Sequence, residues 1–333
     1  MPLIAGLMPA RLVYIAAEFG IAYLIADGTT DAEGLARHAG LHAPSLKRML
    51  RALCAYGVFE ERSPGEFGLC ALGAQLRRNV PGSLRDFARF FGDQRSWNCL
   101  GEIEHTIRTG ETGMSRAFGM NSFNWLAEHP KEAAIFNAAM ADTTNLVARA
   151  ATSAYDFQAW RVIMDVGGGN GTLLAAILRS APAATGILFD LSAGVREAST
   201  ILERAGVSDR CKVIQGDFFQ SVPKDADLLV LKSVIHDWDD DRAAEILARC
   251  RQATSPESRL ILIERVMPEC MTASAVNQRA ATLDIRMMTI AGGIERTEGE
   301  YRQLLARSGF SCTRTIALGP PSDQSILEAI PAK

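Results

Sequence analysis

The stretch Val162-Ile-Met-Asp-Val-Gly-Gly-Gly-Asn-Gly-Thr172 decides how the rest of the chain is interpreted. It begins with apolar, largely β-branched residues, which predict a buried strand. Glycines follow at 167, 168, 169 and 171, and the apolar spacing after Thr172 predicts a helix. A strand, a glycine-rich turn and a helix form the first unit of a nucleotide-binding α/β fold, because glycine lets the backbone approach a ligand closely at the positive end of the helix.

The spacing of the glycines indicates which nucleotide is bound. Asp165-x-Gly167-x-Gly169-x-Gly171 differs from the G-x-G-x-x-G of dinucleotide dehydrogenases and resembles motif I of the class I S-adenosylmethionine (SAM) dependent methyltransferases. A second apolar strand ends at Asp190, whose carboxylate can accept hydrogen bonds from both ribose hydroxyls. The strand, the helix and the acid together disfavour a glycine loop that binds nothing. The sequence has no Walker pattern, which disfavours an NTPase.

Length and composition fit a globular protein of two domains. The chain has 333 residues, of which 48% are hydrophobic and 22% charged. A net charge of −3 and a pI near 6.0 argue against non-specific nucleic-acid binding by the whole chain. The seven cysteines are scattered without a C-x-x-C pair, which favours reduced thiols in the cytoplasm. We expect no signal peptide, because the apolar N-terminus lacks a basic start and a long apolar core. We expect no membrane partner, because no apolar run approaches the roughly 20 residues that span a bilayer.

Residues 1–92 predict a mainly helical domain that contains a small β-wing. Apolar spacing predicts an amphipathic helix pair or one bent helix from Pro9 to Ala26, and Thr30-Asp-Ala-Glu33 predicts a capping box that opens a short helix. A second helix over 44–56 is followed by two short β segments joined by a turn at 63–65. Two helices followed by a β-wing are typical of a winged helix-turn-helix.

The winged-helix pattern raises the alternative of a DNA-binding regulator. Lys47, Arg48 and Arg51 lie on the predicted second helix, where basic side chains meet phosphates in such proteins. Three basic residues on one helix are more often a solvated face. The alternative stays open at this point as the weaker hypothesis.

The remainder, 93–333, is expected to form one catalytic domain. Its first part, 93–154, is helical and rich in aromatic residues, which either pack in a core or line a ligand cleft beside the nucleotide domain. Its second part, 155–333, alternates strands and helices, with further strands expected at 212–217, 227–232 and 259–264 and two more at the end of the chain. This alternation predicts one doubly wound, Rossmann-like parallel sheet with helices on both faces.

His236 is the strongest candidate for catalysis. It follows the predicted strand 227–232, at the sheet edge where ligands bind in such folds, and no other histidine follows residue 129. A lone histidine is more often structural, but Glu264 closes the predicted strand 259–264 and Glu295 follows the Gly292-Gly293 turn. A neutral imidazole is suited to accept a proton near pH 7, and a carboxylate on its far nitrogen would hold its tautomer. We therefore expect the three side chains to converge. No pair of histidines or cluster of carboxylates suggests a catalytic metal, so we expect none.

Five motifs together resemble the small-molecule O-methyltransferases, which include plant caffeic acid and chalcone enzymes and bacterial antibiotic-tailoring enzymes. The motifs are D-V-G-G-G-N-G at 165–171, F-D-L at 189–191, G-D-F-F at 216–219, L-K-x-x-x-H-D-W at 231–238 and G-G-x-E-R-T at 292–297. The resemblance covers nearly the whole chain and includes the N-terminal module, which the family uses for dimerisation without DNA binding. It therefore implies a homodimer. One departure is Ser192, which stands where the family often has proline.

The resemblance also implies roles for individual residues. His236 is similar to the family's general base, with Glu264 and Glu295 as flanking acids. Gly167 would face the methionine end of SAM, Asp190 the ribose, Leu191 the adenine side, and Asp217 with Phe218 the adenine itself. The cofactor-binding set is Asp165, Gly167, Gly169, Asp190, Leu191, Asp217, Phe218 and Lys232, and the substrate-binding set is Phe136, Met140, Asp237 and Met287.

The function implied is SAM-dependent methylation of a hydroxyl on an aromatic or quinone-like small molecule in secondary metabolism, with S-adenosylhomocysteine as the second product. His236 would remove the hydroxyl proton as the oxygen attacks the methyl group in line. Three alternatives stay open: a nitrogen acceptor, SAM-bound chemistry without methyl transfer, and the DNA-binding regulator. Methionine and aromatic side chains suggest a planar, apolar acceptor but do not identify it.

Overall fold

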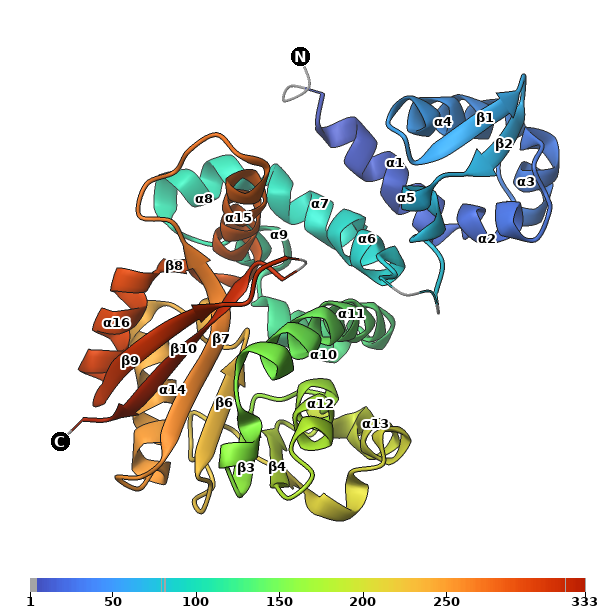
Figure 1. The fold of residues 1–333 in the computed structure, drawn as a ribbon. Coiled ribbons are helices and arrows are strands. Elements are labelled where there is room, and N and C mark those ends of the chain that lie inside the picture. Colours follow the sequence, from blue (N-terminus) through green and yellow to red (C-terminus); the bar gives the residue numbers. More distant parts are fainter. Residues whose placement is uncertain (1–4, 79, 81, 321, 333) are drawn as a thin grey trace. The chain divides into compact units, whose positions relative to one another are not determined.

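The computed structural model describes residues 5–78, 80, 82–320 and 322–332. The chain divides into two compact units, Met1–Asn98 with Glu128–Asp142, and Cys99–Ala127 with Thr143–Lys333. The long helix α11 (Pro130–Ala154) contributes residues to both units. Figure 1 shows the helices and strands with their labels.

The first unit is mainly helical and has its own apolar core. Helices α3 and α4 precede the antiparallel hairpin β1–β2, in which Phe59 pairs with Leu69. The core includes Ile21, Leu50 and Phe67, which are fully buried. The elements are α1 (Leu7–Glu18), α2 (Ile21–Ala26), α3 (Ala32–Ala39), α4 (Ala43–Ala55), β1 (Phe59–Ser63), β2 (Glu66–Leu69), α5 (Ala71–Ala74), α6 (Arg85–Gly92) and the start of α7 (Gln94–Gly101).

The start of α3 differs from its prediction. The residue that caps α3 is Asp31, whose carboxylate accepts a hydrogen bond from the Gly34 amide at 2.7 Å. The hydroxyl of Thr30 instead donates to Glu66 on β2 at 2.5 Å. The predicted capping box from Thr30 to Glu33 is therefore wrong, because the threonine hydroxyl is used in contact with the hairpin.

One of the three basic residues behind the DNA-binding alternative has an acidic partner within its own unit. Arg51 on α4 forms an ion pair with Glu61 on β1, with Nε and Oε2 3.2 Å apart. Both groups are partly exposed, so the pair contributes little to stability, but it reduces the positive potential of this helix.

The second unit is built on an eight-stranded sheet with the order β5-β4-β3-β6-β7-β10-β9, and β8 pairs with β7. Strands β5, β4, β3, β6 and β7 are parallel neighbours. The chain leaves β3 for β4 and β5 and then returns to β6 on the other side of β3. The switch point therefore lies between β3 and β6, and ligands bind outside the carboxyl ends of the strands at such a point.

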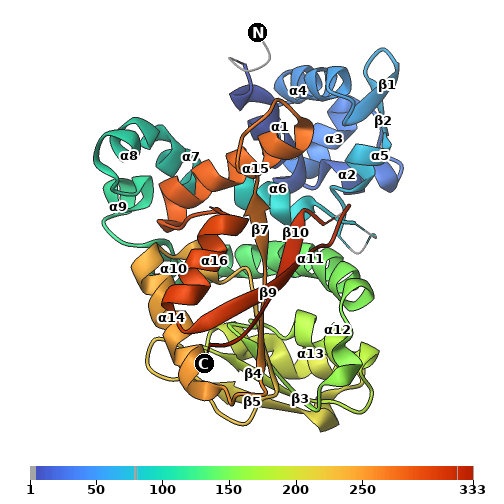
Figure 2. The same cartoon turned by 60° about the vertical axis from the view of Figure 1, so that its left-hand side comes forward.

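The last two strands correct one prediction. Strand β10 runs antiparallel to both β7 and β9, so the sheet is mixed and not wholly parallel (Figure 2). The link from Ala317 to Gln324 is too short for the crossover that parallel neighbours need, so β9 and β10 form a hairpin. Strand β7 (Arg259–Met267) is also longer than predicted, so Glu264 lies within it and does not close it.

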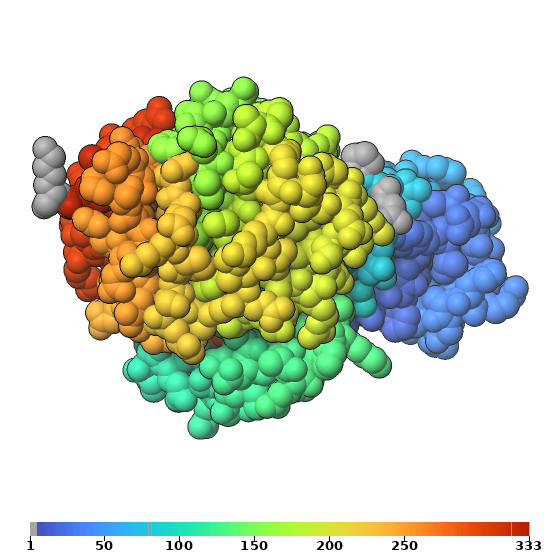
Figure 3. All heavy atoms as spheres, turned by 90° about the horizontal axis from the view of Figure 1, so that it is seen from below, coloured from blue at the N-terminus to red at the C-terminus, as the bar shows by residue number. Residues whose placement is uncertain are grey.

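Helices cover both faces of the sheet. Helices α12 and α13 pack on one face, and α14 and α16 pack on the other. Neighbouring strand residues point to opposite faces, so Ile163 joins the first core and Met164 the second. In the view of Figure 3, the yellow segment between β4 and β6 forms a continuous surface beside α14 in orange.

The remaining elements belong to the second unit, except that Glu128 at the end of α10 belongs to the first. No helix in the described part of the chain is long and apolar enough to cross a membrane. The helices are α8 (Ile103–Thr109), α9 (Gly113–Phe118), α10 (Ser122–Glu128), η1 (Phe157–Ala159), α12 (Thr172–Ser180), η2 (Gly194–Glu197), α13 (Ala198–Ala205), η3 (Ser208–Arg210), η4 (Ile235–Asp237), α14 (Asp240–Ala253), α15 (Ala275–Arg286), the π-helical turn η5 (Met287–Ala291) and α16 (Glu298–Arg307). The strands are β3 (Val162–Val166), β4 (Thr185–Asp190), β5 (Cys211–Gln215), β6 (Leu228–Lys232), β7 (Arg259–Met267), β8 (Arg296–Thr297), β9 (Phe310–Ala317) and β10 (Gln324–Pro331).

Candidate active site

The glycine loop between β3 and α12 needs glycine for both conformation and space. Gly167 and Gly169 have φ of +70° and +57°, in the left-handed region that other residues avoid. A methyl group on Gly167 would lie 2.8 Å from Cγ2 of Val234 and 3.6 Å from the ring of Phe218. The loop therefore approaches both the segment after β6 and the turn after β5, at the carboxyl edge of the sheet.

Asp190, at the end of β4, is bonded to the glycine loop. Its Oδ2 accepts a hydrogen bond from the Gly169 amide at 2.7 Å, and its Oδ1 accepts one from the Leu191 amide at 2.6 Å. Burial raises the pKa of Asp190, and these two amides lower it. The neighbouring Leu191 side chain is 55% exposed, which leaves an apolar surface beside this carboxylate.

Asp165 lies behind the loop. It is buried, and a methyl group on Gly168 would lie 2.6 Å from its Cγ. Its Oδ2 has no hydrogen-bond partner among the described residues. Burial raises the pKa of Asp165 to about 7, against the effect of the Lys232 ammonium, which lowers it. Asp165 therefore lies directly against the backbone of the glycine loop.

Lys232 ends β6 and points into the same region. Its Nζ donates a hydrogen bond to Oγ1 of Thr144 on α11 at 3.0 Å. Burial lowers the pKa of Lys232, and the carboxylates of Glu264, Asp165 and Asp237 raise it. The charge of Lys232 therefore acts both on Asp165 behind the loop and on the acids around His236.

Asp217 and Phe218 form the turn after β5. The carboxylate of Asp217 accepts a hydrogen bond from the Phe219 amide at 2.9 Å, which fixes the turn. The ring of Phe218 meets the indole of Trp238 edge-on, with their centroids 6.3 Å apart. Trp238 in turn stacks on Phe123, so an aromatic wall runs from this turn to the segment that carries His236.

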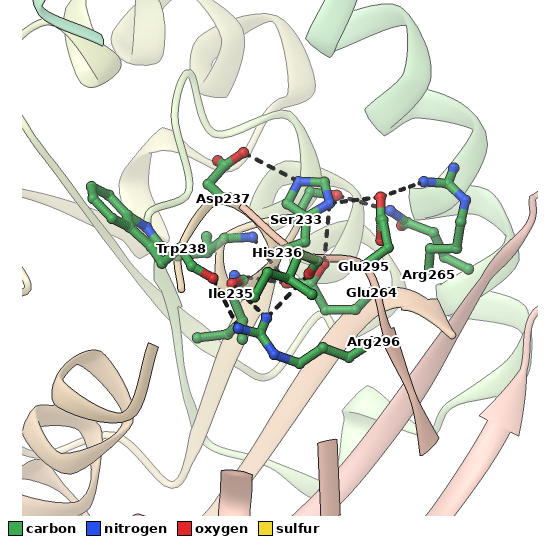
Figure 4. A network of polar contacts seen from close by, with 12 residues as sticks. Ser233, Ile235, His236, Asp237, Trp238, Glu264, Arg265, Glu295 and Arg296 are labelled. Atoms are coloured by element: carbon green, nitrogen blue, oxygen red, sulfur yellow. Dashed lines mark hydrogen bonds and ion pairs between the residues drawn. The ribbon is translucent and has the colours of Figure 1, made fainter. Parts of the chain in front are cut away.

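His236 lies on η4 among three carboxylates (Figure 4). Its Nδ1 is 3.1 Å from Oε1 of Glu295 and 3.9 Å from Oε2 of Glu264, and its Nε2 is 3.5 Å from Oδ1 of Asp237. The imidazole is 14% exposed, whereas both glutamate side chains are buried. The structure therefore brings together His236 on η4, Glu264 on β7 and Glu295 from the link between η5 and β8.

The acids around His236 make it strongly basic. Burial lowers the pKa of His236, but the carboxylates of Glu264, Asp237 and Glu295 outweigh that effect and raise it to about 10. Burial raises the pKa of Glu295, but the hydrogen bonds and charges of His236 and Arg265 lower it by more. The net effect is a lowered pKa. Burial raises the pKa of Glu264, so Glu295 is the glutamate that carries the negative charge most firmly. The surrounding carboxylates therefore favour the protonated imidazole, whereas the sequence suggested a neutral one.

The backbone that carries His236 is held by the neighbouring strand. The amides of Val234 and Ile235 both donate to Oε1 of Glu264, at 3.0 and 2.8 Å. Ser233, just before them, has a φ of +53°, and its hydroxyl accepts a hydrogen bond from Nε2 of Gln324 at 2.8 Å. The left-handed turn at Ser233 lets the chain leave β6 sharply and present these two amides to one carboxylate oxygen.

The G-G-x-E-R-T motif clamps η4 from the other side. The Ile294 amide donates to the His236 carbonyl at 2.8 Å. Arg296 is 1% exposed, and its guanidinium donates to the carbonyls of Ile235 and Trp238 and to the carboxylate of Asp240. Thr297 then caps α16 in a capping box with Glu300.

Arg265 is a residue of the site that the sequence did not reveal. Its Nη1 donates to Oε1 of Glu295 at 2.8 Å, and Nη2 contacts both carboxylate oxygens of Asp323 at 3.0 Å. Ser233 and Gln324 are likewise absent from the sequence-based set. The available signals were weak: a charged residue after Glu264 in an apolar strand, and a serine within the L-K-x-x-x-H motif.

The predicted substrate-binding residues lie in both units. Asp237 is next to His236, and Met287 begins η5, where its carbonyl accepts a hydrogen bond from the Gly292 amide at 2.8 Å. Phe136 and Met140 lie on the part of α11 that belongs to the first unit, where the ring of Phe136 contacts that of Phe90. Among the described residues, no group of three or more His, Cys, Asp or Glu side chains has the arrangement of a metal site.

Two family models match the chain. An O-methyltransferase domain matches residues 98–311, and an O-methyltransferase dimerisation domain matches residues 1–76. The chain belongs to the O-methyltransferase family. The family resemblance, the fold class and the prediction of an enzyme are therefore confirmed.

Three known proteins illustrate the similarity. The chain is 41% identical over 331 residues to phenazine O-methyltransferase PhzM of Lysobacter antibioticus, covering 99% of this chain and 95% of that protein. It is 30% identical to phenazine-1-carboxylate N-methyltransferase of Pseudomonas aeruginosa, covering 95% and 92%. The crystal structure of NcsB1, an O-methyltransferase from neocarzinostatin biosynthesis in complex with SAM and 2-hydroxy-5-methyl naphthoic acid, matches with a TM-score of 0.84 and 31% identity, covering 97% and 96%.

Proposed function

We propose that this protein transfers a methyl group from SAM to a hydroxyl of an aromatic or quinone-like small molecule in secondary metabolism. The observation that carries the proposal is the contact of His236 Nδ1 with Glu295 at 3.1 Å, close to the glycine loop at the carboxyl edge of the sheet. Relatives named for phenazines and a solved relative with a naphthoic acid support a planar aromatic acceptor.

The residues around the glycine loop fit SAM. Gly167 and Gly169 leave backbone uncovered where a side chain would block a ligand, and the exposed Leu191 offers an apolar surface beside Asp190. Asp190 would hold the ribose, and Asp217 with Phe218 the adenine, while Asp165 and Lys232 support the loop from behind. SAM, when bound, supplies an electrophilic methyl group on a positively charged sulfur.

His236 acts on the proton of the acceptor. The pKa of a phenol is about 10, and the surrounding carboxylates raise the pKa of His236 to about 10 as well. Transfer of the proton from the phenol to the imidazole therefore has a free-energy change near zero. A neutral His236 accepts the proton from a bound phenol, whereas a protonated His236 receives the acceptor as a phenolate. Both routes lead to the same imidazolium–phenolate pair, which Glu264 and Glu295 stabilise. General-base catalysis of this kind contributes roughly 10²–10⁴-fold.

Much of the remaining rate enhancement comes from alignment of the acceptor. Asp237 and Met287 flank the His236 segment, and we assign the acceptor site to them together with Phe136 and Met140 on α11. For the last two residues the assignment rests on the family resemblance alone. A planar acceptor fits the aromatic wall of Phe218, Trp238 and Phe123.

A nitrogen acceptor is the second candidate function. It is favoured by one observation, the 30% identity to an N-methyltransferase that spans 95% of this chain. An amine needs less help from a base than a hydroxyl does, so N-methylation would depend less on His236.

The organisation of the protein is part of the proposal. The N-terminal domain, residues 1–92 with its winged helix, forms a homodimer, and residues 93–333 form the catalytic domain with a substrate-side region over 93–154 and a SAM-binding core over 155–333. The match of a dimerisation model to residues 1–76 supports this use of the module over DNA binding. We place the protein in the cytoplasm, since its cysteines form no disulfide among the described residues.

The test is methyl transfer from isotope-labelled SAM, followed by mass spectrometry of the acceptors. Hydroxyphenazines, hydroxynaphthoic acids, phenols and hydroxyquinones are each paired with the matching amine, and the Gly167→Ala variant serves as the control for donor binding. Label on a hydroxyl acceptor supports the proposal, and label on amines alone supports the second candidate. SAM binding without label on any acceptor would instead favour chemistry without methyl transfer, and absence of SAM binding would contradict the assignment of the glycine loop.

A further inference from the structure

The contact between His236 and Glu295 is shared with a third residue. Oε1 of Glu295 accepts from Nδ1 of His236 at 3.1 Å and from Nη1 of Arg265 at 2.8 Å. The other oxygen of Glu295 has no partner among the described residues. One carboxylate oxygen thus lies between two cations, so the position of Arg265 determines how Glu295 approaches the imidazole.

Arg265 itself is held firmly. Its side chain is 11% exposed, and its other guanidinium nitrogens contact both oxygens of Asp323, at 3.0–3.3 Å. Such two-point contacts between arginine and a carboxylate fix the orientation of the guanidinium plane. A series of contacts, Asp323–Arg265–Glu295–His236, therefore runs from the residue before β10 across β7 to η4. Figure 4 shows its last three members.

We infer that Arg265 is a positioning residue for His236, which acts by fixing the place and the charge of the Glu295 carboxylate. The inference rests on the proposed function for its catalytic meaning. Within the described part of the chain, Arg265 forms ion pairs with Glu295 and Asp323 and none with the imidazole, so its influence passes through Glu295.

The charge of Arg265 has a predictable direction of effect. Arg265 contributes to lowering the pKa of Glu295. Its positive charge also weakens the attraction between the Glu295 carboxylate and the protonated imidazole. When that positive charge is lost, the Glu295 carboxylate interacts with the imidazole alone. The pKa of His236 therefore rises. Six other charged or titratable groups lie around the two side chains. They are Asp237 on η4, Glu264 on β7, Lys232 on β6, Asp284 on α15, Arg296 on β8 and Tyr301 on α16.

The experiment measures the protonation of His236 by NMR in the full chain with S-adenosylhomocysteine, using labelled histidine. The chain has five histidines, and the His236→Gln variant assigns the signal. The titration is followed through pH about 10, to which the surrounding carboxylates raise the pKa of His236, and about half of the imidazole is expected to be neutral there. We expect Arg265→Met to raise the midpoint by about one pH unit, which reduces the neutral fraction about fivefold.

Further variants separate charge from packing. Arg265→Lys keeps the charge and is expected to restore most of the wild-type titration. Arg265→Gln keeps hydrogen-bond donors without the charge and is expected to show the upward shift, so it replaces Arg265→Met if that variant fails to fold. Arg314→Met, which breaks an ion pair with Glu328 between β9 and β10, is the matched control and is expected to leave His236 unchanged. In a Glu295→Gln background the effect of Arg265 is expected to vanish.

An unchanged or lowered midpoint in both Arg265→Met and Arg265→Gln would overturn the inference. So would a full shift that persists in the Glu295→Gln background, because it would show that Arg265 does not act through Glu295. The readout does not require turnover. Failure of the proposed function, seen as unchanged methyl transfer by His236→Ala, is therefore distinguishable from failure of this inference.

Discussion

The backbone carbonyl of His236 occupies the space that a side chain on Gly293 would need. The next residue, Ile294, donates its amide to that same carbonyl at 2.8 Å. The segment that carries the histidine and the segment that carries Glu295 are therefore locked together backbone to backbone. This contact explains why a glycine precedes the acid in the G-G-x-E-R-T motif.

Gly293→Ala is expected to disturb this lock. The added methyl group would overlap the His236 carbonyl and also lie 2.7 Å from the Asp237 carbonyl carbon, so backbone must move. We expect a loss of about 1–3 kcal/mol in the free energy of unfolding and a drop in turnover of at least about tenfold. Urea unfolding and initial rates measure both effects, with Gly101→Ala, where the space is open, as the control. Wild-type turnover in Gly293→Ala would contradict the prediction.

His236→Ala is expected to lower turnover at least about tenfold and to leave SAM binding intact, because the base is lost and the glycine loop is not. Since the pKa of His236 is raised to about 10, the wild-type rate with a neutral hydroxyl acceptor should increase with pH up to that region. Rates across a pH series, with calorimetry for SAM, measure both quantities. His105→Ala, which removes an ion pair with Glu111, is the control. Unchanged turnover in His236→Ala would remove the histidine from the mechanism.

Ser233 is expected to tolerate glycine better than a β-branched residue. Its φ of +53° is accessible to glycine and strained for valine, and its side chain makes one hydrogen bond, with Gln324. We expect the free energy of unfolding of Ser233→Gly to stay within about 1 kcal/mol of the wild-type value, because relief of backbone strain offsets the lost hydrogen bond. We expect Ser233→Val to lose at least about 2 kcal/mol of that free energy. Thermal unfolding compares the two variants, and equal stabilities would argue against strain at this position.

Gly167→Ala is expected to impair binding of SAM. The methyl group would lie 2.8 Å from Val234, and φ is +70°, so the loop has to change shape. Gly206 has nearly the same φ, +69°, but open space around it, so Gly206→Ala carries the strain without the overlap. We expect SAM affinity to fall at least about tenfold in the first variant and to stay unchanged in the second, measured by calorimetry. Equal affinities would mean that the loop adapts.

Asp165→Asn is expected to change how stability depends on pH. Burial raises the pKa of Asp165 from 3.8 to about 7, so between these values the folded protein holds a proton that the unfolded chain has released. The free energy of unfolding therefore decreases as pH rises through this window, by on the order of 4 kcal/mol. The asparagine variant lacks this loss, so its stability relative to the wild type should increase from pH 4 to pH 7 and then level off.

Urea unfolding at a series of pH values tests the Asp165 prediction. Asp209→Asn, at an exposed position in η3, is the control. Its free energy of unfolding should depend on pH in the same way as that of the wild type. If the free energy of unfolding of Asp165→Asn has the same pH dependence as that of the wild type, the burial of this carboxyl group in the structure is contradicted.

Local patterns were sufficient for most of the fold. The glycine spacing after Val166 predicted the loop, and the apolar runs predicted the central strands at nearly the right residues. Prediction failed where long-range contacts compete with local ones. Thr30 fits a capping pattern, but its hydroxyl donates a hydrogen bond to Glu66 instead. The direction of β10 likewise depends on its neighbours β7 and β9 in the sheet.

The sequence by itself determined the family, the Rossmann-like fold and the side chains placed at the carboxyl edge of the sheet, because strand periodicity, glycine turns and short motifs are local properties of the chain. The tertiary structure alone decided how these side chains act on one another. It placed Arg265 and His236 on one oxygen of Glu295, set Ser233 against Gln324, and surrounded the imidazole with enough negative charge to raise its pKa to about 10. Such contacts join residues distant in sequence and depend on packing and burial, which local sequence patterns do not encode.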